Sequence, residues 1–581
     1  MPLSGIRLTW LVAFVSATAA GAADSRTAPP TRFVVRPARV ELRGDFARGQ
    51  LIVTAADHRG TSSDRSRDLT HDAVYGSSNP GVVTVGKTGR LLAAGNGTTN
   101  VSVIVNGLTR TVPVTVSGVN ANPQVGFASH VMPVLSKAGC NMGACHASQY
   151  GKGGFKLSVF GYQPRQDHAH IVRDRRQRRL NKLQPERSLI LRKPTMQVPH
   201  GGGKRLHAGS VDYRILTEWI RNGAPPAKRN APHVTKLVVT PPRRVGETGL
   251  KQQLRVDALY SDGTTRDVTA WAKYDSMDEA LLDVDAGGRV TALGNGQAPV
   301  MVRFEGQAQI AMFVMPYAKA VRLTGWKSNN FVDELAAGKF RELGIEPSPL
   351  CDDATFIRRA FFDAVGALPT VQETTAFLSS RDPRKREKLV DRLLGLTGNP
   401  KLDAYNDRYA AFWTLKWSDL IRNSSNNVGE QGMWSLHNWL KESFRTNKRF
   451  DKFVTELVTA KGSTYSNGPA NYFRINRNAS DLTESTTQLF LGIRMQCAKC
   501  HHHPFEVWSQ DDFYGFASFF SRVGHHGGLS PPISGGEELI FTARTGELIH
   551  GRTGEVVVPK TLTGAPLALR PADDPREVLA D

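Results

Sequence analysis

The chain has 581 residues, of which 40% are hydrophobic and 22% are charged, and it contains five cysteines. This length is too great for a single hydrophobic core and predicts about four domains. Five cysteines are too few to staple a chain of this size through disulfides alone, and the formal net charge of +21 favours anionic partners.

The first 22 residues have the pattern of a secretory signal peptide. Arg7 precedes an apolar run over residues 8–20, which ends in the small residues Ala20-Gly21-Ala22. The run is shorter than the roughly 20 apolar residues that span a bilayer, and no later segment predicts a transmembrane helix. We therefore expect an exported protein, periplasmic or at the cell surface. This location excludes nucleic acid and leaves an unknown redox partner or an anionic cell-surface polymer.

A sequence repeat with an offset of 199 residues divides the N-terminal half. Arg67-Asp-Leu-Thr70 recurs as Arg266-Asp-Val-Thr269, and the turns Gly89-Arg90 and Gly95-Asn-Gly97 recur at the same offset. Short Val- and Thr-rich runs between Gly and Asn turns predict β-sandwiches over residues 31–118 and 234–317. Both segments resemble the bacterial immunoglobulin-like modules of group two, which implies a role in spacing or adhesion.

Residues 121–230, between the repeats, predict a small α-helical unit. Phe127, Val131, Val134 and Leu135 recur at helical spacing. This helix leads into the motif Cys140-Asn-Met-Gly-Ala-Cys145-His146, and a second helix over about residues 211–221 closes the unit.

Residues 322–525 predict a mainly helical domain. Thr370-Val-Gln-Glu373 is a capping-box signature that opens one helix, and a helix over about residues 481–495 leads to Cys497-Ala-Lys-Cys500-His501. Residues 526–581 predict a short β tail that ends in the start of a further helix. We interpret that ending as the truncated start of another domain.

The motif at Cys497 has the spacing of a covalent haem c site. Two thiols add to the haem vinyl groups, and His501 then supplies the proximal nitrogen to iron. Two alternatives remain open: a disulfide between Cys497 and Cys500, or zinc bound by both thiolates with His501, His502 or His503. Distal ligands for this haem would come from His437, His503, His525 or His526.

The motif Cys140-x4-Cys145-His146 predicts a second haem c site with wider spacing, and a simple disulfide is its main competitor. His146 would be the proximal ligand. Met196 and His200 are the candidate distal ligands, since three glycines after His200 would let the backbone approach a flat ligand closely.

Longer motifs carry a resemblance to a known family. Phe331-Val-Asp-Glu-Leu, Leu415-Lys-Trp-Ser-Asp-Leu420 and Cys497-Ala-Lys-Cys-His-His-His-Pro-Phe505 resemble domain-of-unknown-function family 1549, found in large secreted cytochrome-like proteins of the planctomycete type. The segment from Cys140 to Ala224 is similar to the cytochrome c-like domain that precedes it there. The ending Asp574-Pro-Arg-Glu-Val-Leu-Ala580 resembles the start of companion family 1553.

The sequence thus predicts a multidomain chain: two all-β sandwiches, a cytochrome c-like helical domain between them, and a helical C-terminal domain with a β tail. The predicted function is covalent haem binding and electron transfer by an exported c-type cytochrome-like protein. One alternative is an extracytoplasmic binding or adhesion scaffold with disulfide- or zinc-stabilised cysteine pairs. Another is a haem or metal enzyme acting on an extracellular polymer, although the sequence indicates no catalytic residues.

Overall fold

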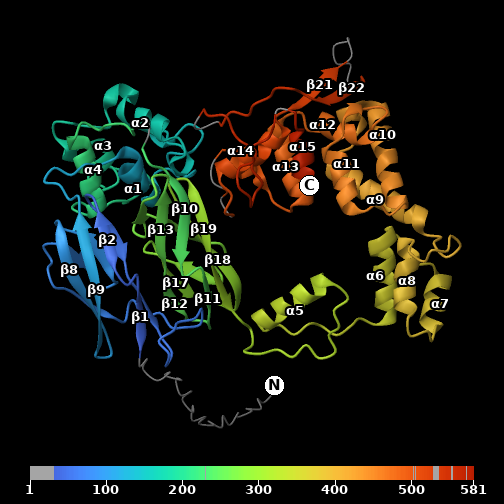
Figure 1. The fold of residues 1–581 in the computed structure, drawn as a ribbon, viewed down its shortest axis with the longest axis horizontal. Coiled ribbons are helices and arrows are strands. Elements are labelled where there is room, and N and C mark those ends of the chain that lie inside the picture. The colour runs from blue at the N-terminus through green and yellow to red at the C-terminus, as the bar shows by residue number, and fades with distance from the viewer. Residues whose placement is uncertain are drawn as a thin grey trace, which may run out of the picture.

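The structure is a computed structural model that describes residues 32–228, 231–500, 503, 506–527, 536–550, 554–570 and 572–581. The predicted signal peptide lies outside these residues. The β-rich N-terminal region and the helical C-terminal region confirm the coarse prediction of a multidomain chain with both classes of structure (Figure 1). No helix among the described residues has the length and apolarity needed to cross a membrane.

The first repeat, residues 33–117, is β-sandwich-like. Its longest strand pair has an alternating pattern, with Val112, Val114 and Val116 buried and their neighbours exposed. Its strands are β1 (Phe33–Arg36), β2 (Val40–Arg43), β3 (Arg48–Gln50), β4 (Ile52–Ala55), β5 (Val74–Ser77), β6 (Val83–Val85), β7 (Arg90–Ala93), β8 (Gly97–Val105) and β9 (Leu108–Ser117).

The second repeat, residues 234–315, has equivalent sheets. The order β2-β9-β8-β5 recurs as β11-β19-β18-β15, and β3-β7-β6 recurs as β12-β17-β16. In both repeats the outer pair β2/β9 or β11/β19 is parallel. The strands are β10 (Val234–Thr240), β11 (Arg243–Val245), β12 (Lys251–Gln253), β13 (Arg255–Tyr260), β14 (Thr265–Asp267), β15 (Lys273–Ser276), β16 (Leu282–Val284), β17 (Arg289–Ala292), β18 (Gly296–Phe304) and β19 (Gln307–Met315).

The recurring Arg-Asp-x-Thr motif forms the same corner in both repeats. The N–H of Thr70 donates to Asp68 Oδ1 at 2.9 Å, and Tyr75 Oη donates to the Thr70 carbonyl at 2.7 Å. In the second repeat Thr269 N–H donates to Asp267 Oδ1 at 2.9 Å and Tyr274 Oη to the Thr269 carbonyl at 2.9 Å. The sequence repeat is therefore also a repeat of hydrogen bonds.

The two repeats exchange contacts through these same aspartates. The N–H of Gln253, in the second repeat, donates to Asp68 Oδ2 at 2.5 Å. Reciprocally, the N–H of Gln50, in the first repeat, donates to Asp267 Oδ2 at 2.6 Å. Gln50 and Gln253 occupy equivalent positions at the ends of β3 and β12, so the junction has an approximate two-fold relation.

Burial raises the free energy of these two carboxylates in their charged form, so their stability depends on hydrogen-bond and ion-pair partners. Desolvation raises the pKa of Asp267, and the guanidinium of Arg255, 2.8 Å away, opposes that rise. Desolvation likewise raises the pKa of Asp68, opposed by hydrogen bonds from Thr70 and Gln253. Arg255 also donates to the Gln50 carbonyl at 2.7 Å, so one side chain joins the carboxylate to the facing repeat.

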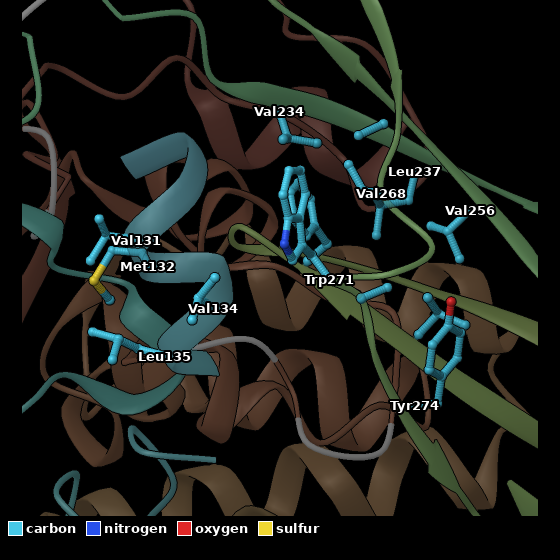
Figure 2. Packing of buried hydrophobic residues seen from close by; sticks show 14 of the residues in the cluster. Val131, Met132, Val134, Leu135, Val234, Leu237, Val256, Val268, Trp271 and Tyr274 are labelled. Atoms are coloured by element: carbon cyan, nitrogen blue, oxygen red, sulfur yellow. The ribbon is translucent and has the colours of Figure 1, made fainter. Parts of the chain in front are cut away.

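The segment between the repeats, residues 121–228, is here called the inserted unit. Its apolar side chains, among them Val131, Val134 and Leu135, share one continuous core with the second repeat (Figure 2). Trp271 of the second repeat is buried within that cluster. The helices of the unit are α1 (Met132–Lys137), α2 (Pro164–Val172), α3 (Leu189–Arg192) and α4 (Val211–Arg221).

The C-terminal region is mainly helical. The predicted capping box is confirmed: Thr370 and Glu373 bond reciprocally at the start of α7. The helices are α5 (Phe331–Leu343), α6 (Asp353–Val365), α7 (Val371–Ser379), α8 (Lys385–Leu394), α9 (Asn406–Ile421), α10 (Ser425–Arg445), α11 (Phe450–Val458), α12 (Asn471–Ile475), α13 (Ala479–Phe490), α14 (Gln510–Ala517) and α15 (Pro575–Ala580); the strands are β20 (Gly462–Ser463), β21 (Val523–Gly527) and β22 (Glu538–Thr542).

The helix predicted over about residues 481–495 ends earlier than expected. Helix α13 stops at Phe490, because Gly492 takes a positive φ of 68° that continues no right-handed helix. A separate 3-10 turn, Met495–Lys499, then carries the cysteine motif.

Replacing Asp267 by alanine should destabilise the junction by about 2–4 kcal/mol, because it removes one of the two carboxylates that pair with Arg255 and leaves the N–H groups of Gln50 and Thr269 without their acceptor. Urea denaturation followed by far-ultraviolet circular dichroism measures the change. The matched control is Asp283→Ala, at the exposed position of β16, which should stay within about 0.5 kcal/mol of the parent. Equal stabilities for the two variants would contradict this account of the junction.

Candidate functional site

The first cysteine motif follows α1 directly. The N–H of Cys140 donates to the Leu135 carbonyl at 2.9 Å, and the N–H of His146 donates to the Cys140 carbonyl at 3.1 Å. Cys140 packs against the apolar core of the inserted unit, and burial raises the pKa of its thiol to about 12. The thiol is therefore protonated near neutral pH, which makes it a poor nucleophile and a poor metal ligand.

The structure brings His146 and His200 together. Their ring centroids lie 6.3 Å apart with an angle of 20° between the planes. The Nδ1 atom of His146 lies 3.1 Å from the carbonyl oxygens of Lys152 and Phe155, and Nδ1 of His200 lies 2.8 Å from the Gly203 carbonyl. Desolvation lowers the pKa of His146. Met196, the other predicted distal ligand, is 48% exposed.

The second cysteine motif lies on the 3-10 turn before α14. The N–H of Cys500 donates to the Cys497 carbonyl at 3.4 Å, and both cysteines are exposed. Ala498, between them, is buried against Phe513 of α14. His501, the predicted proximal ligand, lies outside the described residues, as does His502.

The predicted distal ligands for this motif occupy different elements. His503 is buried, with its N–H donating to the Trp508 carbonyl at 3.0 Å. His525 lies on β21, 3.5 Å from Glu538, with His526 next to it, and His437 lies on α10 with its ring edge towards Trp434. Within the described ranges, no group of three or more His, Cys, Asp or Glu side chains could hold a metal ion. Zinc bound with His501 stays a prediction.

Sequence reasoning missed two clefts. One, of about 710 Å³, lies where the inserted unit, the second repeat and the C-terminal tail meet, and its walls include Phe160, Trp271, Glu305 and His550. The other, of about 1270 Å³, follows the junction of the two repeats and is lined by many basic side chains. Their walls come from segments far apart in the chain, so no local motif marks them. The 199-residue repeat was the one signal that pointed to the junction.

Glu305, on the wall of the first cleft, is a strongly perturbed acid. It lies in the turn between β18 and β19, and its Oε1 atom is buried without a hydrogen-bond partner. Desolvation raises the pKa of Glu305 to about 8, although Arg266 and a hydrogen bond from Tyr260 act in the opposite direction. The carboxyl group is therefore mostly protonated at neutral pH.

Comparison with known proteins gives one family match and one curated relative. Residues 331–525 match the family PSCyt2, described as a protein of unknown function (DUF1549). The predicted resemblance of the helical region is thereby confirmed. An S-layer-related protein of Niallia circulans is 44% identical over 63 residues, which are 11% of this chain and 4% of that protein. The chain thus matches only a small part of this relative.

Solved structures add distant likenesses. Domains 4–9 of the surface layer protein SbsC align at a TM-score of 0.21 and 11% identity, over 50% of this chain and 32% of that one. Domains 5–6 of SbsC align at 0.20 and 11%, over 49% and 96%. Invasin, a bacterial integrin-binding protein, aligns at 0.12 and 12%, over 49% and 59%. Such low TM-scores carry no argument about function.

The curated relative contradicts the main predicted function. Covalent haem binding and electron transfer by a c-type cytochrome is wrong on this finding, which favours the alternative of a surface scaffold. At the first motif, thioether formation would need two accessible sulfurs at one porphyrin edge, and Cys140 is partly buried against the core of the inserted unit. The second motif has accessible sulfurs, so spacing alone did not distinguish haem attachment from other uses of two thiols.

The raised pKa of Glu305 predicts a pH dependence of stability. The folded protein keeps a proton that the unfolded chain releases near the ordinary value of 4.5, so stability should fall as pH rises from about 4.5 to about 8 and then level off. Glu305→Gln, which cannot ionise, should remove that contribution. Thermal unfolding midpoints between pH 5 and pH 9 measure this contribution. The midpoint of the variant should rise relative to that of the parent as pH increases. Glu279→Gln, at an exposed position, is the control; parallel profiles for all three proteins would refute the assignment.

Proposed function

We propose that this chain is an exported binding or adhesion scaffold of the cell surface. The observation that carries the proposal is the stretch of 44% identity to an S-layer-related protein. It is supported by two β-sandwich-like repeats that reciprocal hydrogen bonds join into one module. A module of this kind holds attached domains at a fixed spacing, which is what a surface scaffold requires.

The assignment of both repeats to the immunoglobulin-like modules of group two is part of this proposal, as are the domain limits 31–118, 121–230, 234–317, 322–525 and 526–581. Support comes from the shared Arg-Asp-x-Thr corner and the shared strand order. The helical region would then be the part that the module presents.

In this setting the cysteine pairs serve as structural cross-links. Cys497 and Cys500 lie one 3-10 turn apart with exposed side chains, and an oxidising exterior favours a disulfide between them. Cys140 and Cys145 flank one short loop of the inserted unit, which a second disulfide would close.

Surface location predicts that intact producing cells expose the chain. A membrane-impermeant amine-reactive biotin reagent should label it to the same extent as in lysed cells. Deleting residues 8–20, the apolar run of the predicted signal peptide, should abolish this labelling while the chain remains detectable inside. Labelling only after lysis of the full-length producer would overturn the proposal.

The cross-links predict a mass difference. Each disulfide removes two hydrogen atoms, so the exported chain should gain the mass of four hydrogens on reduction, and peptide mapping should place the bonds within each pair. A Cys497→Ser/Cys500→Ser variant should lose one of the two bonds and keep the other. Free thiols at all four positions in freshly exported protein would contradict the structural role.

A further inference from the structure

The junction of the two repeats creates two equivalent clefts. Arg48 on β3 pairs in register with Leu92, and Lys251 on β12 pairs with Thr291. Positions 92 and 291 differ by the repeat offset of 199, so Arg48 and Lys251 are equivalent residues. By the same offset, Trp271 is equivalent to Asp72. The two-fold exchange through the buried aspartates therefore places a wall with Arg48 and Trp271 on one side of the junction and an equivalent wall with Lys251 and Asp72 on the other.

One of these clefts is filled by the inserted unit. Asp212, at the start of α4, forms an ion pair with Arg48 at 2.6 Å. The Arg48 guanidinium lies over the Trp271 ring, 5.0 Å from its centroid, and His130 meets the same ring edge-on at 5.8 Å. A carboxylate on the basic residue and an aromatic contact thus hold the unit in place.

The equivalent cleft on the other side is open, with a volume of about 1270 Å³. Among the described residues, Lys251 forms no ion pair, in contrast to its equivalent Arg48, and Asp72 replaces the docking Trp271. This wall is therefore polar, which disfavours a second packed helical unit. The basic residues that line it are Arg65, Arg67, Arg244, Lys251, Arg289 and Lys319.

The cations of this open cleft are only partly neutralised. Its carboxylates are already engaged: Asp72 pairs with Arg67 at 2.8 Å and Glu247 lies 3.5 Å from Lys319, while Asp68 is held by the junction. Within the part of the chain that the structure describes, Arg65 and Arg289 have no ion pair. Arg244 is 3% exposed, and its Nε atom is buried without a partner. The cleft thus lacks the anion that Asp212 supplies on the other side.

We infer that the open cleft between the repeats binds an acidic polysaccharide, whose anionic groups pair with Lys251 and Arg289. This inference rests on the proposed surface function and names the ligand class. The volume exceeds the roughly 300–1000 Å³ of small-molecule pockets, which suits several linked sugars. Tyr317, on the cleft wall and 60% exposed, offers an aromatic face for a sugar ring.

Binding of the full chain to defined polymers tests the inference. The probes are polygalacturonate, with carboxylates, dextran sulfate, with sulfates, and neutral dextran. At low ionic strength the chain should bind one or both acidic polymers and not dextran, and added salt should weaken the binding. The acidic polymer that binds more tightly identifies the anionic group. Equal binding to dextran, or binding to neither acidic polymer, would overturn the inference.

Matched variants locate the site. Lys251→Ala/Arg289→Ala should weaken binding to the preferred polymer about tenfold, because both pairing cations are lost. Lys87→Ala/Arg110→Ala removes the same charge from exposed positions outside the cleft and should keep near-parental affinity. Circular dichroism confirms that both variants are folded.

If both variants lost polymer affinity equally, binding would depend on the overall charge of the chain and not on the cleft. That result would overturn the inference. Failure of the inference and of the proposed function remain distinguishable. A chain that intact cells expose, but whose cleft variants bind polymer as the parent does, retains its surface role and loses the assigned site.

Discussion

The exchange of two buried aspartates across the repeat junction is the interaction on which the N-terminal half depends. Each carboxylate has two tasks: one oxygen holds the Thr corner of its own repeat, and the other accepts an N–H from the facing repeat. Because a buried carboxylate is stable only with its donors in place, neither repeat can shift without exposing both sites to the desolvation cost. The same four hydrogen bonds therefore fix the corners and the relative position of the sandwiches.

An approximate two-fold relation gives two similar surfaces, and the sequence then makes them different. On one side Trp271 and Arg48 receive the inserted unit, whose apolar residues merge with the core of the second repeat. On the other side Asp72 and Lys251 leave a polar, basic wall. Two differences between equivalent positions, Trp271 against Asp72 and Arg48 against Lys251, thus distinguish a surface that docks a protein unit from one suited to polar ligands. The insertion between the repeats explains why only one side is filled, since a single chain supplies one such unit.

Much of this architecture could be predicted from the sequence, because the repeat offset and the strand alternation are local signals. The capping box at Thr370 was equally readable. The end of α13 could not be predicted. The apolar periodicity continues past Phe490, and the positive φ of Gly492 that ends the helix is not visible in that pattern. The role of Asp68 was also hidden: its motif identified a recurring module, but the donor that completes its hydrogen bonds comes from a residue 185 positions away. The function predicted from the cysteine motifs was wrong for a related reason: three residues define a spacing, whereas the partial burial of Cys140 depends on the whole unit around it.

Net charge, like the cysteine motifs, does not by itself identify a binding site. A charge of +21 favours anionic partners without locating where they bind, since most surface cations are solvated and screened beyond about 8 Å at physiological ionic strength. What distinguishes Lys251 is the comparison inside the molecule itself. Its equivalent, Arg48, pairs with a carboxylate, so the described part of the chain contains one paired and one unpaired version of the same position. This comparison within the molecule locates the binding site that net charge alone does not. The pair of Arg48 with Asp212 shows that a basic residue at this position accepts a carboxylate.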